Sequence, residues 1–383
     1  MEYKALGSLV DRKIGYGIVQ PGQNILHGVP VIKVNNLIDG LHSKGELDVT
    51  TKENDEKYSR TRLEGGELIV SVVGTVGKTA IVPKSFRGCN LVRAVAMIDI
   101  KENWLSRWVK YYIDSPAGQA YIEQNLNTTV QATLNIKTLV DMPIPFLKED
   151  EMRKIVTILE AIDRKIECNQ QINDNLQQQA MALYAEMFLN SSNNDVTSGT
   201  LSDIAVITMG QSPSGSSYNE DGVGEVFYQG RAEFGFRFPK RRLFTTEPKR
   251  MAVAGDVLLS VRAPVGDLNM AYERCCIGRG LGAIHSKTGH SSFVLYTMFA
   301  LRSQLNVFNG EGTVFGSINR DALNAIPIDV PLVTKIDRFE AVAHPIDELI
   351  RTNYEENCRL EAIRNSLLPK LMSGEIDVSA IRL

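Results

Sequence analysis

The sequence predicts an α+β protein in which two globular α/β domains are joined by two long antiparallel coiled-coil helices, giving a dumbbell with a pseudo-two-fold axis. Two observations predict this fold. The chain repeats itself with a period of about 185 residues, and each repeat ends in a long segment with a heptad pattern. Such a period is far outside the 20–50 residues of solenoid repeats, so it indicates duplication of a whole domain together with its helix.

The repeat is visible as short matching segments that keep their order along the chain. Gly66–Ser71 returns as Gly255–Ser260, 189 residues later. Three dipeptides return 184 residues later, namely Thr129-Val130 as Thr313-Val314, Pro143-Ile144 as Pro327-Ile328, and Ile162-Asp163 as Ile346-Asp347. The change in offset needs only a few residues of net loop deletion. Two copies of one unit indicate a protein that performs one task at two places.

The two globular domains are predicted at 1–147 and 197–331. Both contain short runs rich in β-branched residues, which are separated by Gly, Pro and Asn and therefore read as strands. The predicted strands lie at 29–34, 67–73, 93–100, 225–228 and 256–261. Helices are predicted at 104–121, with an internal break at Ser115-Pro116, and near 291–306.

Two long helices are predicted at 148–190 and 332–376, where the apolar period changes to 3.5 residues. The positions seven apart, taken as heptad position a, are Ile155, Ile162, Asn169, Leu176 and Leu183, then Phe339, Ile346, Asn353, Leu360 and Leu367. The residues taken as heptad position d are Ile158, Ile172, Val342, Leu349 and Ile363. Leu159, Ile166, Ala180 and Met187 are expected beside this seam.

Asn occupies the third a position of both helices, as Asn169 and Asn353. A buried Asn weakens a seam but fixes its register, so these two residues are predicted to set the register of the pair. The first helix spans about 60 Å at 1.5 Å per residue. The second helix must run back along the first if the two pack together, and this makes the pair antiparallel.

Composition places few limits on function. The chain of 383 residues has a net charge of −3, with 43% hydrophobic and 23% charged residues, as expected of a soluble globular protein with two or three cores. Its five cysteines form no Cys-x-x-Cys pair, and no segment reads as a signal peptide or a membrane span. We therefore expect a cytoplasmic protein with no metal site, no cofactor of its own and no membrane partner.

One segment resembles a catalytic motif, the phosphate-binding P-loop. Gly74–Thr79 ends in Gly-Lys-Thr, but the glycine that must precede it is replaced by Val72, and the second repeat reads Gly266-Asp267-Leu268. The chain also lacks the nucleophile elbow, the His-Glu-x-x-His helix and the dinucleotide fingerprint. The sequence therefore predicts a non-catalytic protein.

Each repeat carries a basic stretch that indicates a phosphate-facing surface. Residues 225–280 contain ten Lys/Arg against six Asp/Glu, and residues 57–93 contain seven against two. The candidate DNA-binding residues are Gln20, Lys57, Arg60, Arg62 and Lys78 in the first repeat, and Arg231, Arg237, Lys240, Arg241, Arg242 and Arg262 in the second. Each alone is compatible with an ordinary solvated surface, so the hypothesis depends on the paired clusters.

The chain resembles a specificity subunit of a type I restriction-modification system over essentially its whole length. The matching segments are Ser202–Ala205, Gly210–Tyr218, Phe227–Gly230, Gly255–Gly266, Gly278–Ile284 and Leu367–Ile376, with looser matches at Leu6–Leu9 and Gly15–Gly22. The resemblance implies that 1–147 and 197–331 are target recognition domains 1 and 2. It also implies that 148–190 and 332–376 are the two spacer helices.

The resemblance implies a mechanism as well. Each recognition domain reads one half of a split, asymmetric site on double-stranded DNA, and the helices set the spacer between the halves. The helices also dock two methyltransferase subunits, which restriction and motor subunits then join. S-adenosylmethionine and ATP belong to those partner chains. Met181, Tyr184 and Phe188 fit such a partner surface, unless they pack inside the chain's own helix pair.

Two alternatives come from other classes of protein. A coiled-coil adaptor whose end domains bind proteins or glycans accounts for the helices and the duplication, but not for the paired basic stretches. A self-sufficient restriction or methylation enzyme requires motifs that the sequence lacks. Salt-sensitive DNA binding discriminates against the first alternative, and an activity assay of the isolated chain tests the second.

Overall fold

The computed structural model describes residues 2–41, 43–127, 131–190, 196–309 and 316–381. The chain forms two compact units, each built around one sequence repeat. Unit 1 comprises residues 1–166 together with 357–383, and unit 2 comprises residues 167–356. The repeated dipeptides Thr129-Val130 and Thr313-Val314 involve residues outside the described ranges.

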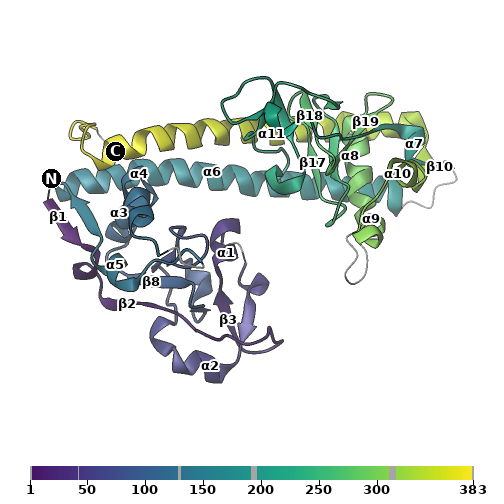
Figure 1. Cartoon of the computed structure of the whole chain (residues 1–383). Coiled ribbons are helices and arrows are strands. Elements are labelled where there is room, and N and C mark those ends of the chain that lie inside the picture. Colours follow the sequence, from purple (N-terminus) through teal and green to yellow (C-terminus); the bar gives the residue numbers. More distant parts are fainter. Residues whose placement is uncertain (1, 42, 128–130, 191–195, 310–315, 382–383) are drawn as a thin grey trace. The chain divides into compact units, whose positions relative to one another are not determined.

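Unit 1 contains two sheets and a two-stranded ribbon (Figure 1). A four-stranded antiparallel sheet has the order β2-β8-β5-β6, and a three-stranded sheet has the order β4-β3-β7, in which β3 and β7 are parallel. The strands are β1 Glu2–Ala5, β2 Arg12–Tyr16, β3 Val29–Ile32, β4 Asp48–Thr50, β5 Leu68–Ser71, β6 Thr79–Ile81, β7 Asn90–Leu91, β8 Val95–Asp99 and β9 Pro143–Phe146. The short helices are α1 Val34–Asp39, α2 Lys52–Lys57, α3 Asn103–Asp114, α4 Pro116–Gln124 and α5 Ile136–Val140.

Unit 2 repeats this arrangement. Its four-stranded sheet has the order β11-β19-β16-β17, and its second sheet, β12-β14-β13-β18-β15, again contains a parallel pair, β13 and β18. The strands are β10 Val196–Thr200, β11 Ala205–Met209, β12 Tyr218–Asn219, β13 Glu225–Tyr228, β14 Phe244–Thr245, β15 Met251–Ala252, β16 Val257–Ser260, β17 Leu268–Met270, β18 Cys275–Ile277, β19 Leu281–Ser286 and β20 Pro327–Pro331. The short helices are α7 Leu201–Ile204, α8 Ser291–Ala300, α9 Arg302–Asn306 and α10 Arg320–Asn324.

The turn after the central strand shows that the repeat in sequence is a repeat in structure. In unit 1 the backbone N–H of Lys78 donates to Ser71 Oγ at 2.9 Å, and in unit 2 the N–H of Asp267 donates to Ser260 Oγ at 2.9 Å. The N–H of the preceding glycine donates to the same serine's carbonyl in both turns, at 2.9 and 3.1 Å. The offset of 189 residues read from the sequence is therefore confirmed here.

Each four-stranded sheet is buried on both faces, which explains why its central strands are continuously apolar. In β5, Leu68 and Val70 pack in one core with α3, whereas Ile69 between them packs in a second core against the three-stranded sheet. In β16, Val257 and Leu259 likewise face one core and Leu258 the other. The period of two along each strand thus separates two hydrophobic layers.

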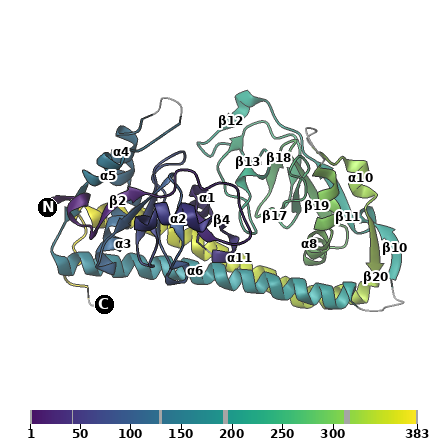
Figure 2. The same cartoon turned by 90° about the horizontal axis from the view of Figure 1, so that it is seen from below.

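The long helices are α6, Glu149–Tyr184, which continues as a π-helical turn Ala185–Leu189, and α11, Val333–Met372. In both units they lie side by side (Figure 1 and Figure 2). In unit 1, Asp163 accepts a hydrogen bond from Arg364, whereas in unit 2 the contacts pair residues higher in α6 with residues lower in α11. The predicted antiparallel pairing is confirmed within each unit.

The predicted second row of the seam is wrong. Ile172, Val342, Leu349 and Ile363, assigned to position d, are between 38% and 51% exposed. The buried row lies four residues after each a position instead, and its members are Leu159, Ile166, Asn173, Ala180, Ala343, Ile350, Asn357 and Leu371. Both rows recur every seven residues and both contain apolar side chains. The 3.5-residue period alone therefore does not identify which row faces the partner helix.

Two of the three residues expected at a partner surface pack inside unit 2. Tyr184 is buried, and its ring centroid lies 5.6 Å from that of Phe339. Phe188 joins the same aromatic cluster, 5.3 Å from Phe293. Only Met181 is exposed, at 40%. The π-helical turn at the end of α6 thus belongs to the hydrophobic core of unit 2.

Candidate nucleic-acid interface

Four of the predicted cations are exposed and available to a ligand. Arg60, Lys78, Lys240 and Arg262 form neither an ion pair nor a side-chain hydrogen bond within the described part of the chain. Gln20, the predicted base reader of the first repeat, is also exposed. These residues come from different loops, so the structure supports a dispersed set of phosphate contacts more than one tight cluster.

The other two predicted cations of unit 1 are held by carboxylates on the same short segment. Lys57 donates to Glu53 at 2.8 Å across one turn of α2. Arg62 bonds to Asp55 and, at 2.9 Å, to Glu56. Hydrogen bonds to Asp55 and Glu56 raise the pKa of Arg62, whose side chain is 37% exposed.

Three arginines of the predicted basic loop in unit 2 are also paired, although all three are half-exposed. Arg231 pairs with Asp267, and Arg241 pairs with Glu273. Arg242 donates to Glu233 at 2.6 Å and to Glu220 at 3.2 Å. Exposed ion pairs contribute only about 0–1 kcal/mol. Each arginine can therefore exchange its carboxylate for a phosphate at little cost.

Arg237 is the exception, and its assignment to a DNA-binding surface is wrong for this structure. Its side chain is 2% exposed. The guanidinium donates to Asp347 at 2.6 Å and to Gln177 at 3.0 Å, both on the long helices. The aromatic residues around it in the sequence, read as part of a nucleic-acid loop, belong to the packing that surrounds this buried ion pair.

The two predicted register residues lie in the seam. Asn169 is 1% and Asn353 is 8% exposed. Asn169 donates to Glu356 at 2.8 Å, and Asn353 donates to Asn173 Oδ1 at 2.8 Å. Asn173 was missed in the sequence, although it stands four residues after Asn169 and thus on the same helix face. Their role in fixing register remains a prediction.

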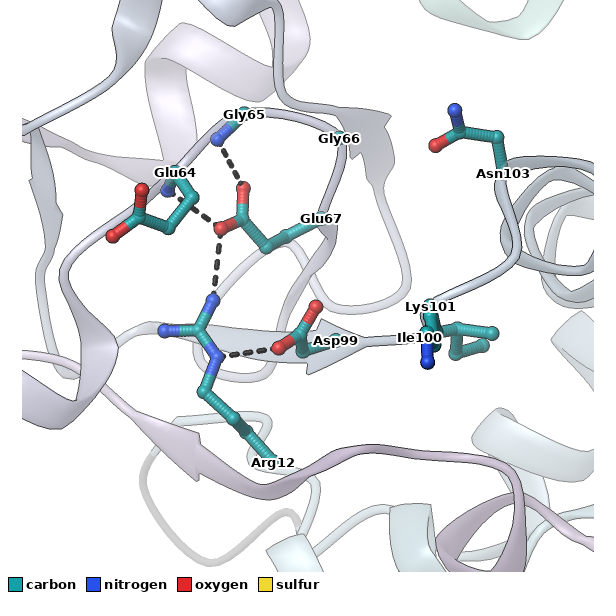
Figure 3. A pocket seen from close by; sticks show the side chains of 9 residues that line it. All are labelled: Arg12, Glu64, Gly65, Gly66, Glu67, Asp99, Ile100, Lys101 and Asn103. Carbon is teal, nitrogen blue, oxygen red and sulfur yellow. Dashed lines mark hydrogen bonds and ion pairs between the residues drawn. The ribbon is translucent and has the colours of Figure 1, made fainter.

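A pocket beside β2 and β5 of unit 1 is unsuited to nucleic acid. Figure 3 shows Arg12 between Glu67 and Asp99, and the Glu67 carboxylate accepts hydrogen bonds from the backbone N–H groups of Glu64 and Gly65 at 2.6 and 2.8 Å. The charge of Arg12 is already balanced by Glu67 and Asp99. The carboxylates repel phosphate, so this pocket serves to hold the loop before β5.

A second pocket, in unit 2, has the chemistry that base recognition needs. It is lined by Gly210, Gln211, Ser212, Pro213, Gly215, Tyr218, Gln229 and Arg279. The phenol of Tyr218 donates to the carbonyl of Pro213 at 3.0 Å, and Gln229 lies within hydrogen-bond distance of Ser212 Oγ at 3.4 Å. We call these eight residues the amide pocket. Its two glutamines and one arginine are side chains that read base edges by paired hydrogen bonds.

The amide pocket forms where a loop crosses the carboxyl ends of the parallel strands β13 and β18. A Cβ atom on Gly210 would lie 2.1 Å from the carbonyl oxygen of Gly278, so only glycine permits this approach. In unit 1 a Cβ on Gly17 would lie 2.0 Å from the carbonyl oxygen of Leu91 in β7. Both units therefore bring an equivalent loop to the same edge of an equivalent strand pair.

Two further findings limit the chemistry of the chain. Among the described residues, no group of three or more His, Cys, Asp or Glu side chains is placed to hold a metal ion. Within those same ranges, no helix is both long enough and apolar enough to cross a membrane.

The fold is that of a duplicated recognition protein, with two α/β units that each present basic loops and pack on a pair of helices. The family model for the type I restriction modification DNA specificity domain matches residues 20–178. The MjaX type I restriction enzyme specificity subunit of Methanocaldococcus jannaschii is 27% identical over 379 residues, covering 92% of this chain and 88% of the relative. The EcoBI specificity subunit of Escherichia coli is 30% identical over 152 residues, covering 39% and 32%.

The crystal structure of the S subunit of a type I restriction-modification system from M. genitalium has the same fold. It is 16% identical, with a TM-score of 0.54, over 96% of this chain and 95% of that one. The chain belongs to the family of type I restriction-modification specificity subunits. The predicted resemblance is thereby confirmed, as is its assignment as a specificity subunit and not a catalytic chain.

Proposed function

We propose that this chain is the sequence-specific DNA-binding subunit of a type I restriction-modification complex. Residues 1–147 and 197–331 each read one half of a bipartite, asymmetric site on double-stranded DNA. The observation that carries the proposal is the duplicated unit with exposed, unpaired cations in each copy, in a chain of this family. Because the two units differ in their loops, the two half-sites are expected to differ. Such a protein acts in the cytoplasm, as the sequence predicts.

The DNA-contacting set follows from availability. Arg60, Lys78, Lys240 and Arg262 are free, and the exposed pairs of Lys57, Arg62, Arg231, Arg241 and Arg242 are weak enough to be replaced by phosphate contacts. Gln20 remains a candidate for base contact. Arg237 is withdrawn from this set because Asp347 holds it inside unit 2.

We also propose that the helices set the spacer and dock two methyltransferase subunits, which a restriction and motor subunit then joins. The exposed apolar residues Val342, Leu349 and Ile363 support a docking role, because they form a row seven residues apart on α11 that does not face α6. At 1.5 Å per residue, the 36 residues of α6 extend roughly 54 Å. A rigid element of this length is suited to act as a ruler along DNA.

The proposal is tested by methylation mapping of DNA from cells that carry this chain with its neighbouring methyltransferase. A split, asymmetric methylated motif is expected only when the chain is present. Replacing residues 1–147 with the equivalent domain of a relative should change one half of the motif and leave the other half intact. A change in both halves contradicts the modular assignment.

The ruler hypothesis has its own experiment. One heptad inserted in α6 near Asn175, with a matching heptad in the facing part of α11, adds about 10.5 Å, or roughly three base pairs. The spacer is expected to lengthen while both half-sites stay unchanged. An unchanged spacer with both heptads present, in a complex that still methylates DNA, contradicts this role of the helices.

A further inference from the structure

We propose that Arg93 and Arg279 are the equivalent base-reading arginines of the two units. This inference rests on the proposed DNA-binding function and names residues that the basic stretches alone do not single out. Arg279 lines the amide pocket of unit 2, and Arg93 occupies the corresponding position in unit 1. Each contacts the base edges of one half-site only.

The equivalence follows from backbone hydrogen bonds. In unit 1 the N–H of Ile18 donates to Leu91 O at 2.7 Å, and in unit 2 the N–H of Gln211 donates to Ile277 O at 3.0 Å. Leu91 ends β7 and Ile277 ends β18. Arg93 and Arg279 each stand two residues beyond that point, between the parallel strand and the next strand of the four-stranded sheet.

Both backbones are fixed on the crossing loop, whereas both side chains are free. The N–H of Arg93 donates to the carbonyl of Ile18 at 2.8 Å, and the N–H of Arg279 donates to Ser212 Oγ at 3.2 Å. Both residues are exposed, and neither forms an ion pair with any residue that the structure describes. Most exposed arginines nearby, such as Arg241 and Arg242, have carboxylate partners. Arg93 and Arg279 are thus held in place with their guanidinium groups available.

The position of the two arginines suits a ligand that approaches the carboxyl ends of a parallel strand pair. Loops at these ends of parallel strands commonly form ligand sites in α/β sheets. In unit 2, Gln211 and Gln229 flank Arg279 in the amide pocket. Arginine bonds the O6 and N7 atoms of guanine with two hydrogen bonds, and glutamine bonds N6 and N7 of adenine in the same way.

The surroundings of the two arginines differ, which accounts for two different half-sites. Gln229 follows β13 in unit 2, whereas Lys33 follows β3 in unit 1 and pairs with Asp48. The crossing loop of unit 2 offers Gln211 where that of unit 1 offers the buried Ile18. The shared arginine is therefore expected to read one base pair in each half, and its neighbours are expected to make the rest of the two half-sites different.

The experiment is selection of bound duplexes from a randomised DNA library by the full chain with its methyltransferase. The wild-type complex first yields a bipartite consensus, and affinities are then measured on that sequence. Arg279→Gln is expected to lower affinity roughly 5- to 150-fold and to lose the preference at one G·C pair of one half-site. Arg93→Gln is expected to do the same in the other half only.

The matched control is Arg338→Gln, which alters an exposed and unpaired arginine on α11. Arg279→Lys keeps the charge but loses the forked donor geometry, so it should retain the salt dependence and still lose the base preference. Thermal unfolding of each variant verifies that the fold is intact. A variant that unfolds early is replaced by Arg279→Lys or Arg93→Lys for the same comparison.

The outcomes separate this inference from the proposed function. If the wild-type complex selects no consensus, the DNA-specificity function itself fails. If the wild type selects a consensus and Arg279→Gln and Arg93→Gln match the Arg338→Gln control, the arginine assignment is wrong. A uniform loss of affinity over all sequences, with a salt slope smaller by about one, assigns the arginines to phosphate and overturns base reading.

Discussion

The two units attach their globular parts to the long helices through the same pair of groups, but different arginines complete the two sites. In unit 1 the hydroxyl of Tyr111, on α3, donates to Asp163 at 2.7 Å. In unit 2 the hydroxyl of Tyr296, on α8, donates to Asp347 at 2.8 Å. The two aspartates are those of the repeated Ile-Asp dipeptide. We call these sites the Tyr–Asp contacts.

The arginine differs in its origin and its burial. Arg364 of α11 donates to Asp163 at 2.7 Å, and these side chains are 30% and 22% exposed. In unit 2 the arginine is Arg237, from the loop after β13, and its pair with Asp347 is only 2% and 8% exposed. Duplication thus preserved the tyrosine and the aspartate, whereas the positive charge comes from the helix in one unit and from a loop in the other.

Burial also affects the tyrosines. It raises the pKa of Tyr111, and the adjacent Asp163 carboxylate raises it further. Burial likewise raises the pKa of Tyr296, although the neighbouring Arg237 opposes this effect. Both phenols therefore stay protonated and remain hydrogen-bond donors to the aspartates over the physiological pH range. The Tyr–Asp contacts are accordingly independent of pH in that range.

The largest expected effect comes from removing the arginine of each Tyr–Asp contact. Arg237→Met leaves the Asp347 carboxylate buried without its counter-charge, so the free energy of unfolding of unit 2 is expected to fall by roughly 3–5 kcal/mol. Arg364→Met leaves the partly solvated Asp163, and the expected loss is roughly 1.5–3 kcal/mol. Denaturant titration, with hydrogen exchange on α8 and α3, measures the two losses separately.

Arg338→Met is the control for these variants, because Arg338 is exposed on α11, and its effect should stay within about 0.5 kcal/mol. Equal losses for Arg237→Met and Arg364→Met contradict the role assigned to burial. A loss of DNA binding in Arg237→Met without a loss of stability restores the interpretation of Arg237 as a DNA contact.

A smaller effect is expected at the buried asparagines, where the helices face each other in unit 2. Asn353→Leu removes the donor to Asn173 Oδ1 and leaves that buried oxygen unpaired, at an expected cost of roughly 1–3 kcal/mol in the free energy of unfolding. Asn173→Leu combined with Asn353→Leu removes both partners and is expected to be nearly neutral. A double-mutant cycle in denaturant measures the coupling between them.

The register hypothesis adds a second measurement to this cycle. If the asparagines specify pairing, the double variant should lose uniqueness of packing, seen as additional amide signals from α6 and α11. A double variant that is as unique and as stable as the wild type removes the register role from these residues. Additive losses in the cycle contradict the hydrogen bond between Asn173 and Asn353.

Much of the fold could be predicted from the sequence because its signals are local or repeated. The helix break at Ser115-Pro116, the two long helices and the apolar central strands all follow from patterns of neighbouring residues. The row of the helix that faces its partner did not follow, because Leu159 and Ile172 fit a 3.5-residue period equally well. Only tertiary packing selected the first and exposed the second.

The candidate site was harder to predict because sequence shows charge but not its partners. Arg237 sits among basic and aromatic residues, yet its partner Asp347 lies 110 residues away. Arg93 and Arg279 carried the opposite information, because each was counted in a basic stretch but not selected. Aligning the two repeats on the ends of the predicted strands at 93–100 and 281–286 was the signal that could have found them.

The smallest effect concerns a position that the two units share, the cysteine at the start of the second parallel strand. Cys89 precedes β7 and Cys275 begins β18, and both are fully buried. Burial raises the pKa of the Cys275 thiol to about 12, and it also raises the pKa of Cys89. Since the thiolate is the reactive form, a raised pKa keeps both thiols unreactive.

Alkylation by iodoacetamide between pH 7 and pH 9 measures this equivalence. Cys168 and Cys358 are exposed and should react readily, whereas Cys89 and Cys275 should react only when their unit opens. At pH 8 a pKa of about 12 in place of 9.0 lowers the thiolate fraction of Cys275 by roughly a thousandfold. Mass spectrometry of the labelled peptides follows each cysteine. Labelling of Cys275 as fast as that of Cys358 would show that the core beneath β18 is open, and the two units would then differ where the structure makes them alike.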